Sequence, residues 1–140
     1  MNIQRINSHL ERSQEIFSLL SQLTTAVAFD ETRFKNIIYS LKDNHNIYLY
    51  LKDNKIVGMI TLFIEQKLIH NGAKVAHIED LVVDKDYQKQ GIATELINFC
   101  LSQLRSDTCY KVILDCKGEL APFYEKLGFK ETNVQMSKYF

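Results

Sequence analysis

The chain has 140 residues, of which 46% are hydrophobic and 24% are charged, and this suits one domain with a core of its own. Its 17 basic and 17 acidic residues give no net charge, and no basic stripe argues for salt-dependent binding to a nucleic-acid backbone. We therefore expect residues 1–140 to form a single folded unit that holds any bound anion by local contacts.

Targeting signals and metal motifs are not evident in the sequence. The longest apolar stretch, residues 56–64, is shorter than the roughly 20 residues that cross a bilayer, and the N-terminus lacks the pattern of a secretion signal. Cys100, Cys109 and Cys116 are odd in number and show no Cys-x-x-Cys spacing. Because such thiols within apolar stretches are typically buried and reduced, we expect a cytoplasmic protein without a disulfide framework or a metal site.

The N-terminal part predicts one strand and two helices. Residues 2–6 are typical of a short strand, and apolar residues recur near the helical period over residues 8–23. A second helix is predicted after Asp30, which suits an N-cap, and Glu31 suits the positive end of its dipole. The buried stripe of this helix is predicted to comprise Phe34, Ile37, Ile38 and Leu41.

Three antiparallel strands are predicted next. Residues 47–51 and 56–68 are rich in β-formers, and an Asp53-Asn54 turn between them indicates a hairpin. Asn71-Gly72 is a stronger turn signal, because both residues tolerate positive φ, and it leads into a strand over residues 76–83.

The C-terminal part alternates helices and strands. Residues 91–104 have one apolar side and predict a helix, which is followed by a strand over residues 110–114. A short helix over residues 122–127 is predicted to end at Gly128, and the chain from residue 129 onward predicts a final strand. The order β-α-α-β-β-β-α-β-α-β indicates a mixed α/β (α+β) domain.

The segment from Val82 to Thr94 carries the clearest chemical signal. A buried strand leads through a polar loop into a helix that opens with Gly91 and Ala93, small residues that let a ligand approach the backbone. The first turn of a helix leaves about four N–H groups unpaired and carries roughly half a positive charge, which suits a diphosphate. Taken alone, Gln88-x-x-Gly91-x-Ala93 fits a plain loop-to-helix junction equally well.

In its context, this pattern resembles the acyl-CoA signature of the GNAT superfamily of N-acetyltransferases. Further segments resemble one family within it, the glucosamine 6-phosphate N-acetyltransferases. These segments are residues 77–83 (HIEDLVV), 87–88 (YQ), 109–116 (CYKVILDC) and 123–129 (FYEKLGF), with weaker likeness at 67–70 and 23–25. The resemblance implies the GNAT fold, a central, mostly antiparallel twisted sheet flanked by helices. It also implies transfer of acetyl from acetyl-CoA to the 2-amino group of D-glucosamine 6-phosphate, a step of UDP-N-acetylglucosamine biosynthesis.

The resemblance assigns a site for acetyl-CoA and implies no metal. The residues expected to hold the pantetheine arm through their backbone are Leu81, Val82 and Val83. The residues expected to cradle the diphosphate are Gln88, Lys89, Gln90, Gly91, Ile92, Ala93 and Thr94.

The resemblance also assigns catalytic residues. Tyr124 matches the family's acid, because a phenol with a reference pKa of about 10 can stabilise or protonate the departing thiolate; taken alone, an aromatic residue beside Phe123 indicates core. Asp115 is expected to orient the attacking amine, and Glu79 or Asp80 to contact sugar hydroxyls or accept the released proton. Adjacent strand residues point to opposite faces, so Glu79 and Asp80 reach one atom only if a bulge intervenes.

Further residues are expected to bind the amino sugar. By resemblance, Lys67 and His70 contact its phosphate, Thr24 lies near the sugar and Cys116 adjoins Asp115. Family members often have an arginine near the C-terminus that reaches the partner subunit's substrate. Lys138 would take its place here, with a point charge instead of a planar fork. The resemblance thus implies a homodimer whose final strands are exchanged or packed between subunits, with each sugar site shared.

Three alternatives stay open. The first is an acetyltransferase of the same fold for another primary amine, such as a peptide, a polyamine or an aminoglycoside. The second is a non-catalytic CoA-binding module, which would need neither Tyr124 nor Asp115. The third is a covalent route through Cys116, which is disfavoured because a thiol in an apolar strand stays protonated.

Overall fold

A computed structural model describes residues 1–106 and 108–140, and within this part of the chain five strands form one sheet in the order β1-β2-β3-β4-β5. The strands are β1 (Ile3–Arg5), β2 (His45–Lys52), β3 (Lys55–Gln66), β4 (Lys74–Val83) and β5 (Cys109–Ile113). Strands β1 to β4 pair antiparallel, and β5 pairs parallel with β4. The predicted mixed α/β fold with a mostly antiparallel sheet is confirmed.

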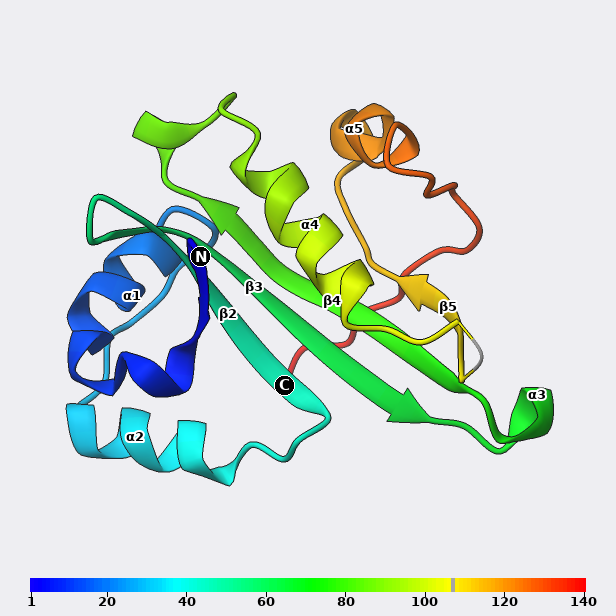
Figure 1. Cartoon of the computed structure of the whole chain (residues 1–140), viewed down its shortest axis with the longest axis horizontal. Helices are drawn as coiled ribbons and strands as arrows, with labels where there is room; N and C mark the ends of the chain where they lie inside the picture. Colours follow the sequence, from blue (N-terminus) through cyan, green and yellow to red (C-terminus); the bar gives the residue numbers. More distant parts are fainter. Residues whose placement is uncertain (107) are drawn as a thin grey trace.

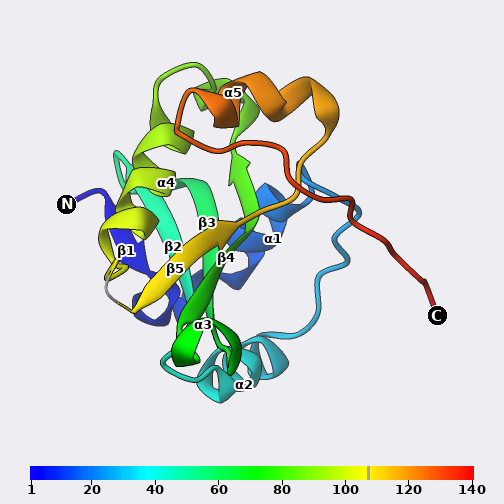
Figure 2. The same cartoon turned by 90° about the vertical axis from the view of Figure 1, so that its right-hand side faces the viewer.

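Helices cover both faces of the sheet (Figure 1). The α-helices are α1 (Ser13–Leu20), α2 (Glu31–Ser40), the single turn α3 (Ile69–Gly72), α4 (Ile92–Ser102) and α5 (Ala121–Glu125). The 3-10 turns are η1 (Ile6–Ser8), η2 (Leu10–Arg12), η3 (Lys85–Tyr87) and η4 (Gly118–Leu120). Helices α1 and α2 lie on one face of the sheet, and α4 and α5 lie on the other (Figure 2).

Each face of the sheet has its own apolar cluster. Against α1 and α2 pack Leu49, Leu51, Ile56, Met59 and Val82. Against α4 pack Tyr48, Tyr50, Val57, Ile60, Leu62, Ala76 and Ile78. Cys100 belongs to the second cluster, and burial raises the pKa of its thiol to about 12. This thiol therefore stays protonated and acts as a small apolar side chain.

The first two helices differ from their predictions in detail. The helix predicted over residues 8–23 is shorter, because the backbone leaves helical angles at His9 (φ −138°) and Arg12 (φ −103°), so that two 3-10 turns precede α1. Helix α2 begins as predicted, with the Asp30 carboxylate accepting the Arg33 N–H at 2.9 Å. Ile37 is 40% exposed, so the prediction that it belongs to the buried stripe of this helix was wrong.

The final strand predicted from residue 129 onward does not form within this chain. Residues 129–140 adopt neither helix nor strand, and residues 130–140 are exposed. Figure 2 shows this tail, in red, running away from the body of the molecule. A strand needs a neighbour to satisfy its N–H and C=O groups. The sequence pattern of the tail indicates a tendency to be extended, but it does not supply the partner.

Gly58 in β3 lets α4 pack closely on the sheet. A Cβ at this position would lie 3.1 Å from Leu96 Cδ1, 3.2 Å from Ile92 Cγ2 and 3.2 Å from Tyr50 Cβ. Because close-packed interiors relax only partly, we expect Gly58→Ala to lower the free energy of unfolding by about 1–3 kcal/mol. Urea denaturation measures this. The matched control is Gly118→Ala, since nothing lies within 4 Å of a Cβ there; an equal loss in both variants would contradict the packing argument.

Candidate active site

Strand β4 continues beyond the last residue that pairs with β5. The described ladder between them extends from Lys74–Cys109 to His77–Ile113, whereas β4 continues to Val83 with β3 on its other side. Figure 1 shows the chain after β5 turning toward α5 while β4 runs on toward η3. Beyond His77, the N–H and C=O groups on this edge of β4 are therefore available to a ligand. Leu81, Val82 and Val83 lie on this stretch.

A β-bulge lies in β4 where chemistry was predicted. The register with β3 changes between the pairs Met59–Val82 and Thr61–Glu79, and Asp80 has φ of +52°. Glu79 and Asp80 are both exposed, although regular alternation would send one of them inward. The structure thus contains the bulge that Glu79 and Asp80 need if both are to reach one ligand. The positive φ of Asp80 is also the kind of backbone strain that concentrates at functional sites.

The Glu79 carboxyl lies within electrostatic reach of two other carboxyls. Partial burial raises its pKa, and the negative charges of Asp115 and Asp80 raise it further, while His77 lowers it. Each negative neighbour makes loss of the proton from Glu79 less favourable. A raised pKa makes the ionised carboxylate a stronger base, which suits a proton acceptor.

Tyr124 is half-buried on α5. Its ring meets those of Phe123 and Phe129 edge to face, with centroids 5.0 and 6.0 Å apart. Burial raises the pKa of its phenol, and negative charge on Cys116 and Asp115 adds to the effect. The hydroxyl therefore keeps its proton at neutral pH and can donate it. Asp115 is the residue that acts on both Glu79 and Tyr124.

The three cysteines differ in exposure. Cys100 is buried and Cys109 is half-buried, but Cys116 is exposed. The expectation of three buried thiols was wrong for Cys116, because β5 ends at Ile113 and the chain after it lies on the surface. The thiol of Cys116 is placed next to Asp115 and near the Tyr124 phenol.

The loop between β4 and α4 is open on the side where an anion was predicted. Gly91 is the N-cap of α4 with φ of +82°, and nothing lies within 4 Å of a Cβ built there. Lys89 also has a positive φ, +59°. The start of the loop is fixed by Asp84, which accepts the Asp86 N–H at 3.0 Å and pairs with Lys55 Nζ at 2.9 Å. This geometry leaves the N–H groups at the start of α4 free to meet a ligand.

One residue beside this loop was missed by sequence reasoning. Lys52, at the end of β2, donates from Nζ to Gln90 Oε1 at 2.7 Å, and the two residues are 38 apart in the sequence. Gln88 Nε2 donates to the Val83 carbonyl at 3.5 Å. Ile92 is buried, while Ala93 and Thr94 are half-buried in the first turn of α4. No local pattern points from β2 to this loop, so only the fold shows the contact.

The residues predicted to bind the phosphate lie near the β3–β4 connection. Lys67 Nζ lies 3.0 Å from Glu65 Oε1, an ion pair that the sequence did not indicate. His70 has φ of +50° in α3, and its ring centroid lies 4.0 Å from that of Tyr110. Figure 2 shows α3 at the opposite end of the molecule from α5, so the elements that carry His70 and Tyr124 are well separated within one chain.

Thr24 and Lys138 are the remaining predicted sugar contacts. Thr24 is exposed just after α1, where its backbone N–H donates to the Leu20 carbonyl at 3.2 Å. Lys138 lies in the exposed tail, with Nζ 6.0 Å from the ring centroid of Phe140. Among the described residues, neither has a side-chain hydrogen bond or ion pair with Glu79, Asp115 or Tyr124.

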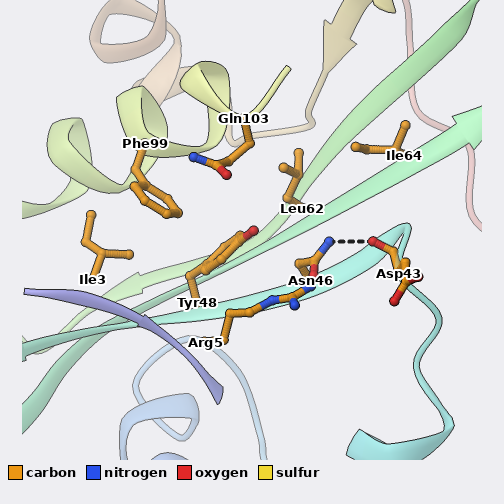
Figure 3. Close-up of a pocket in the computed structure, with 9 residues that line it drawn as sticks. All are labelled: Ile3, Arg5, Asp43, Asn46, Tyr48, Leu62, Ile64, Phe99 and Gln103. Atoms are coloured by element: carbon orange, nitrogen blue, oxygen red, sulfur yellow. Dashed lines mark hydrogen bonds between the residues drawn. The ribbon is translucent and has the colours of Figure 1, made fainter. Parts of the chain in front are cut away.

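Two cavities in the described part of the chain lie elsewhere. One, of about 500 Å³, is lined by Arg5, Tyr48, Phe99, Gln103 and five further residues between the sheet and the C-terminal part of α4 (Figure 3). The other, of about 790 Å³, lies between α1 and the residues that lead into α2. Neither is lined by a predicted site residue. The predicted site is instead an open surface beyond the end of the β4–β5 ladder.

Metal-binding clusters and membrane-spanning helices are both absent from the described part of the chain. Across residues 1–106 and 108–140, no three His, Cys, Asp or Glu side chains are grouped so that they could hold a metal ion. In the same ranges, no helix has the length and apolar character required to cross a bilayer.

Known proteins resemble this chain in sequence and in structure. The acetyltransferase (GNAT) family model matches residues 13–129. Glucosamine 6-phosphate N-acetyltransferase of Arabidopsis thaliana is 38% identical over 136 residues, which are 93% of this chain and 91% of that protein. The enzyme of the same name from Trypanosoma brucei brucei is 37% identical over 134 residues, or 94% and 86% of the two chains. The crystal structure of the Arabidopsis thaliana enzyme matches with a TM-score of 0.92 at 33% identity, covering 99% of this chain and 97% of that chain. The chain therefore belongs to the acetyltransferase (GNAT) family and, within it, to the glucosamine 6-phosphate N-acetyltransferases.

Proposed function

We propose that this protein transfers the acetyl group of acetyl-CoA to the 2-amino group of D-glucosamine 6-phosphate, giving N-acetyl-D-glucosamine 6-phosphate and CoA. Family membership supports this substrate pair. The structural observation that carries the proposal is the edge of β4 left unpaired beyond His77, with the bulge at Glu79 and Asp80 beside it. The charge of Asp115 acts on both Glu79 and Tyr124 and adds support. An acceptor, an orienting group and a donor of protons are the groups that this reaction needs.

The co-substrate is held mainly by backbone groups in this proposal. The pantetheine arm pairs with the free edge of β4 at Leu81, Val82 and Val83, as an added strand would. The diphosphate lies against the loop of residues 88–94, where Gly91 leaves room for it and the dipole of α4 favours its charge. The thioester then lies near Tyr124.

Transfer is direct, with both substrates bound at once. The ammonium group of the sugar first loses a proton to Glu79, and Asp115 holds the resulting amine in line with the thioester carbonyl. A bond forms between nitrogen and the carbonyl carbon, the carbon–sulfur bond breaks, and Tyr124 gives its proton to the departing sulfur. The nitrogen loses its second proton as the amide forms, and this proton restores the Tyr124 phenol. Because Glu79 has to be ionised and Tyr124 protonated, kcat/KM is expected to be bell-shaped in pH.

The sugar site is proposed to be completed by a second copy of the chain. The tail exposes Val134, Met136 and Tyr139, each more than four-fifths accessible to solvent, and β5 is an edge strand. Pairing of the tail with a partner subunit would cover the apolar side chains of the tail and supply a neighbour for the edge of β5. It would also bring Lys138 toward the partner's sugar phosphate, beside Lys67, His70 and Thr24. Static light scattering tests this: a fully active monomer would contradict the homodimer.

The proposed setting is the cytoplasm, in the synthesis of UDP-N-acetylglucosamine. Cys100, Cys109 and Cys116 are free thiols, which suits a reducing compartment. The sugar phosphate product of the proposed reaction is a precursor of the kind that this synthesis requires.

The experiment that tests the function is a thiol-release assay with acetyl-CoA and a panel of amines. We expect rapid release with glucosamine 6-phosphate and little with glucosamine, a peptide amine, a polyamine or an aminoglycoside. Equal rates with the unphosphorylated amines would favour another acetyl acceptor. Binding of acetyl-CoA in calorimetry without turnover of any amine would favour a non-catalytic module.

A further inference from the structure

We propose that His77 is a relay residue, which passes the amine proton from Glu79 to Glu65 and so to solvent. The inference rests on the proposed function, because it concerns the proton that the ammonium group must lose before it attacks. In the proposed mechanism the sugar lies against the Glu79 carboxyl, so this proton needs an exit along the protein side of the site. The side chains beside Glu79 on the same face of the sheet provide one.

The strand register places His77 next to Glu79. The two residues are separated by one position on β4, before the bulge, and they pair with Phe63 and Thr61 of β3. They therefore project to the same face of the sheet, about 7 Å apart along the strand. This separation is suited to one bridging water between the carboxylate and the imidazole. When the imidazole of His77 is protonated, its charge lowers the pKa of Glu79, so the two groups interact.

The other side of the His77 ring meets a carboxylate that leads to solvent. Nε2 of His77 lies 3.1 Å from Oε1 of Glu65, and the two side chains are 23% and 36% exposed. The ring of Phe63, with its centroid 5.5 Å away, packs beside the imidazole. Lys67 and His77 both bond the Glu65 carboxylate and hold its pKa below the ordinary value, so Glu65 stays ionised. The sequence analysis assigned no part in proton transfer to Glu65, Lys67 or His77.

The relay moves one proton from the substrate ammonium group to solvent. An N–H bond of the substrate ammonium breaks, and the proton reaches a Glu79 oxygen. In the resting state of the relay, the imidazole of His77 is neutral and its single ring proton is on Nε2, which donates to Glu65. Nδ1 is then free to take the proton from Glu79 through water. The imidazolium then gives the Nε2 proton to Glu65 and the adjoining solvent. Each group returns to its starting charge after a rotation or exchange of the ring proton.

Several charged or titratable groups surround His77 and contribute to its environment. They are Glu65 from β3, Lys67 just after β3, His45 from β2 on the far side of Phe63, Lys74, Glu79 and Asp80 from β4, Lys111 from β5, and Asp115 after β5. Of these, the structure joins only Glu65 to the imidazole by a hydrogen bond within the described residues. The relay therefore predicts that Glu65 and His77 act together.

The chain offers a matched control for the test. His45 and His77 lie on either side of Phe63, with ring centroids 5.6 and 5.5 Å from it. We expect His77→Gln to lower kcat for glucosamine 6-phosphate about tenfold at neutral pH, with the KM for acetyl-CoA unchanged. The acidic limb of kcat/KM should move to higher pH, because the protonated form of His77, which lowers the pKa of Glu79, is gone. Added imidazole should restore part of kcat. His45→Gln should leave all of these values unchanged.

A second variant keeps the test decisive if His77→Gln folds poorly. Glu65→Gln retains an oxygen that accepts from Nε2 but removes the ionised proton acceptor, and we expect a similar fall in kcat. Unchanged kcat and pH profile in both variants, or an equal loss in His45→Gln, would overturn the relay while the proposed function stands. Absence of sugar-dependent thiol release by the unmodified protein would overturn both.

Discussion

Replacing Tyr124 with phenylalanine is expected to lower kcat about 100-fold, while the KM for acetyl-CoA stays nearly the same. The variant loses only the hydroxyl that gives a proton to the departing sulfur. Its ring contacts with Phe123 and Phe129 do not involve the hydroxyl, so α5 should keep its position. Steady-state kinetics by thiol release, combined with calorimetry of CoA binding, separate the loss of turnover from a loss of affinity.

The pH profile adds a second readout for this variant. If the phenol supplies the proton, the basic limb of the unmodified enzyme belongs to Tyr124 and should vanish in Tyr124→Phe. The control is Cys116→Ser, which alters the neighbouring exposed thiol and should keep most of the activity under direct transfer. Unchanged turnover in Tyr124→Phe would remove its assignment as the acid, and an inactive Cys116→Ser enzyme would favour the covalent route.

The features that the sequence predicted well depend on residues close together in the chain. Asp30 caps α2 as expected, since the capping bond reaches only to Arg33. Asp53 and Asn54 adopt φ of 48° and 61° in the predicted hairpin turn, and Asn71 and Gly72 adopt 57° and 71° in the next one. Such local conformations are determined by side-chain shape, so single residues are enough to indicate them.

The features that the sequence missed depend on contacts between distant segments. Glu65 meets His77, and Lys52 reaches Gln90, only because segments far apart in the sequence are brought side by side. From the sequence, a bulge at Asp80 could be named only as a requirement for Glu79 and Asp80 to reach one atom. The bulge itself is a change of register, which arises only when β3 and β4 pair. The final strand was wrong for the isolated chain for a related reason, because its pairing partner is not determined by its own residues.

The charge of Asp115 predicts the direction in which the pH profile of kcat/KM moves when that charge is removed. Its negative charge raises the pKa of Glu79 and also that of Tyr124. Removing that charge in Asp115→Asn should lower both values, so both limbs of kcat/KM should move toward lower pH. This shift of the acidic limb is opposite in direction to the one expected for His77→Gln. The two variants together therefore test whether Glu79 is the group that sets the acidic limb.

Asp115→Asn is also expected to lower kcat about 100-fold, because the amine loses the carboxylate that holds it in line with the thioester. A pH series of kcat/KM with glucosamine 6-phosphate measures both effects. The matched control is Glu125→Gln, which removes a carboxylate beside Tyr124 in the sequence, whereas the charges that raise the pKa of Tyr124 are those of Cys116 and Asp115. Limbs that stay in place in Asp115→Asn, or that move equally in Glu125→Gln, would contradict the coupling. Movement of both limbs in Asp115→Asn alone would assign the proton acceptor to Glu79 and the donor to Tyr124, because no other pair of groups is joined through this carboxylate in the proposed mechanism.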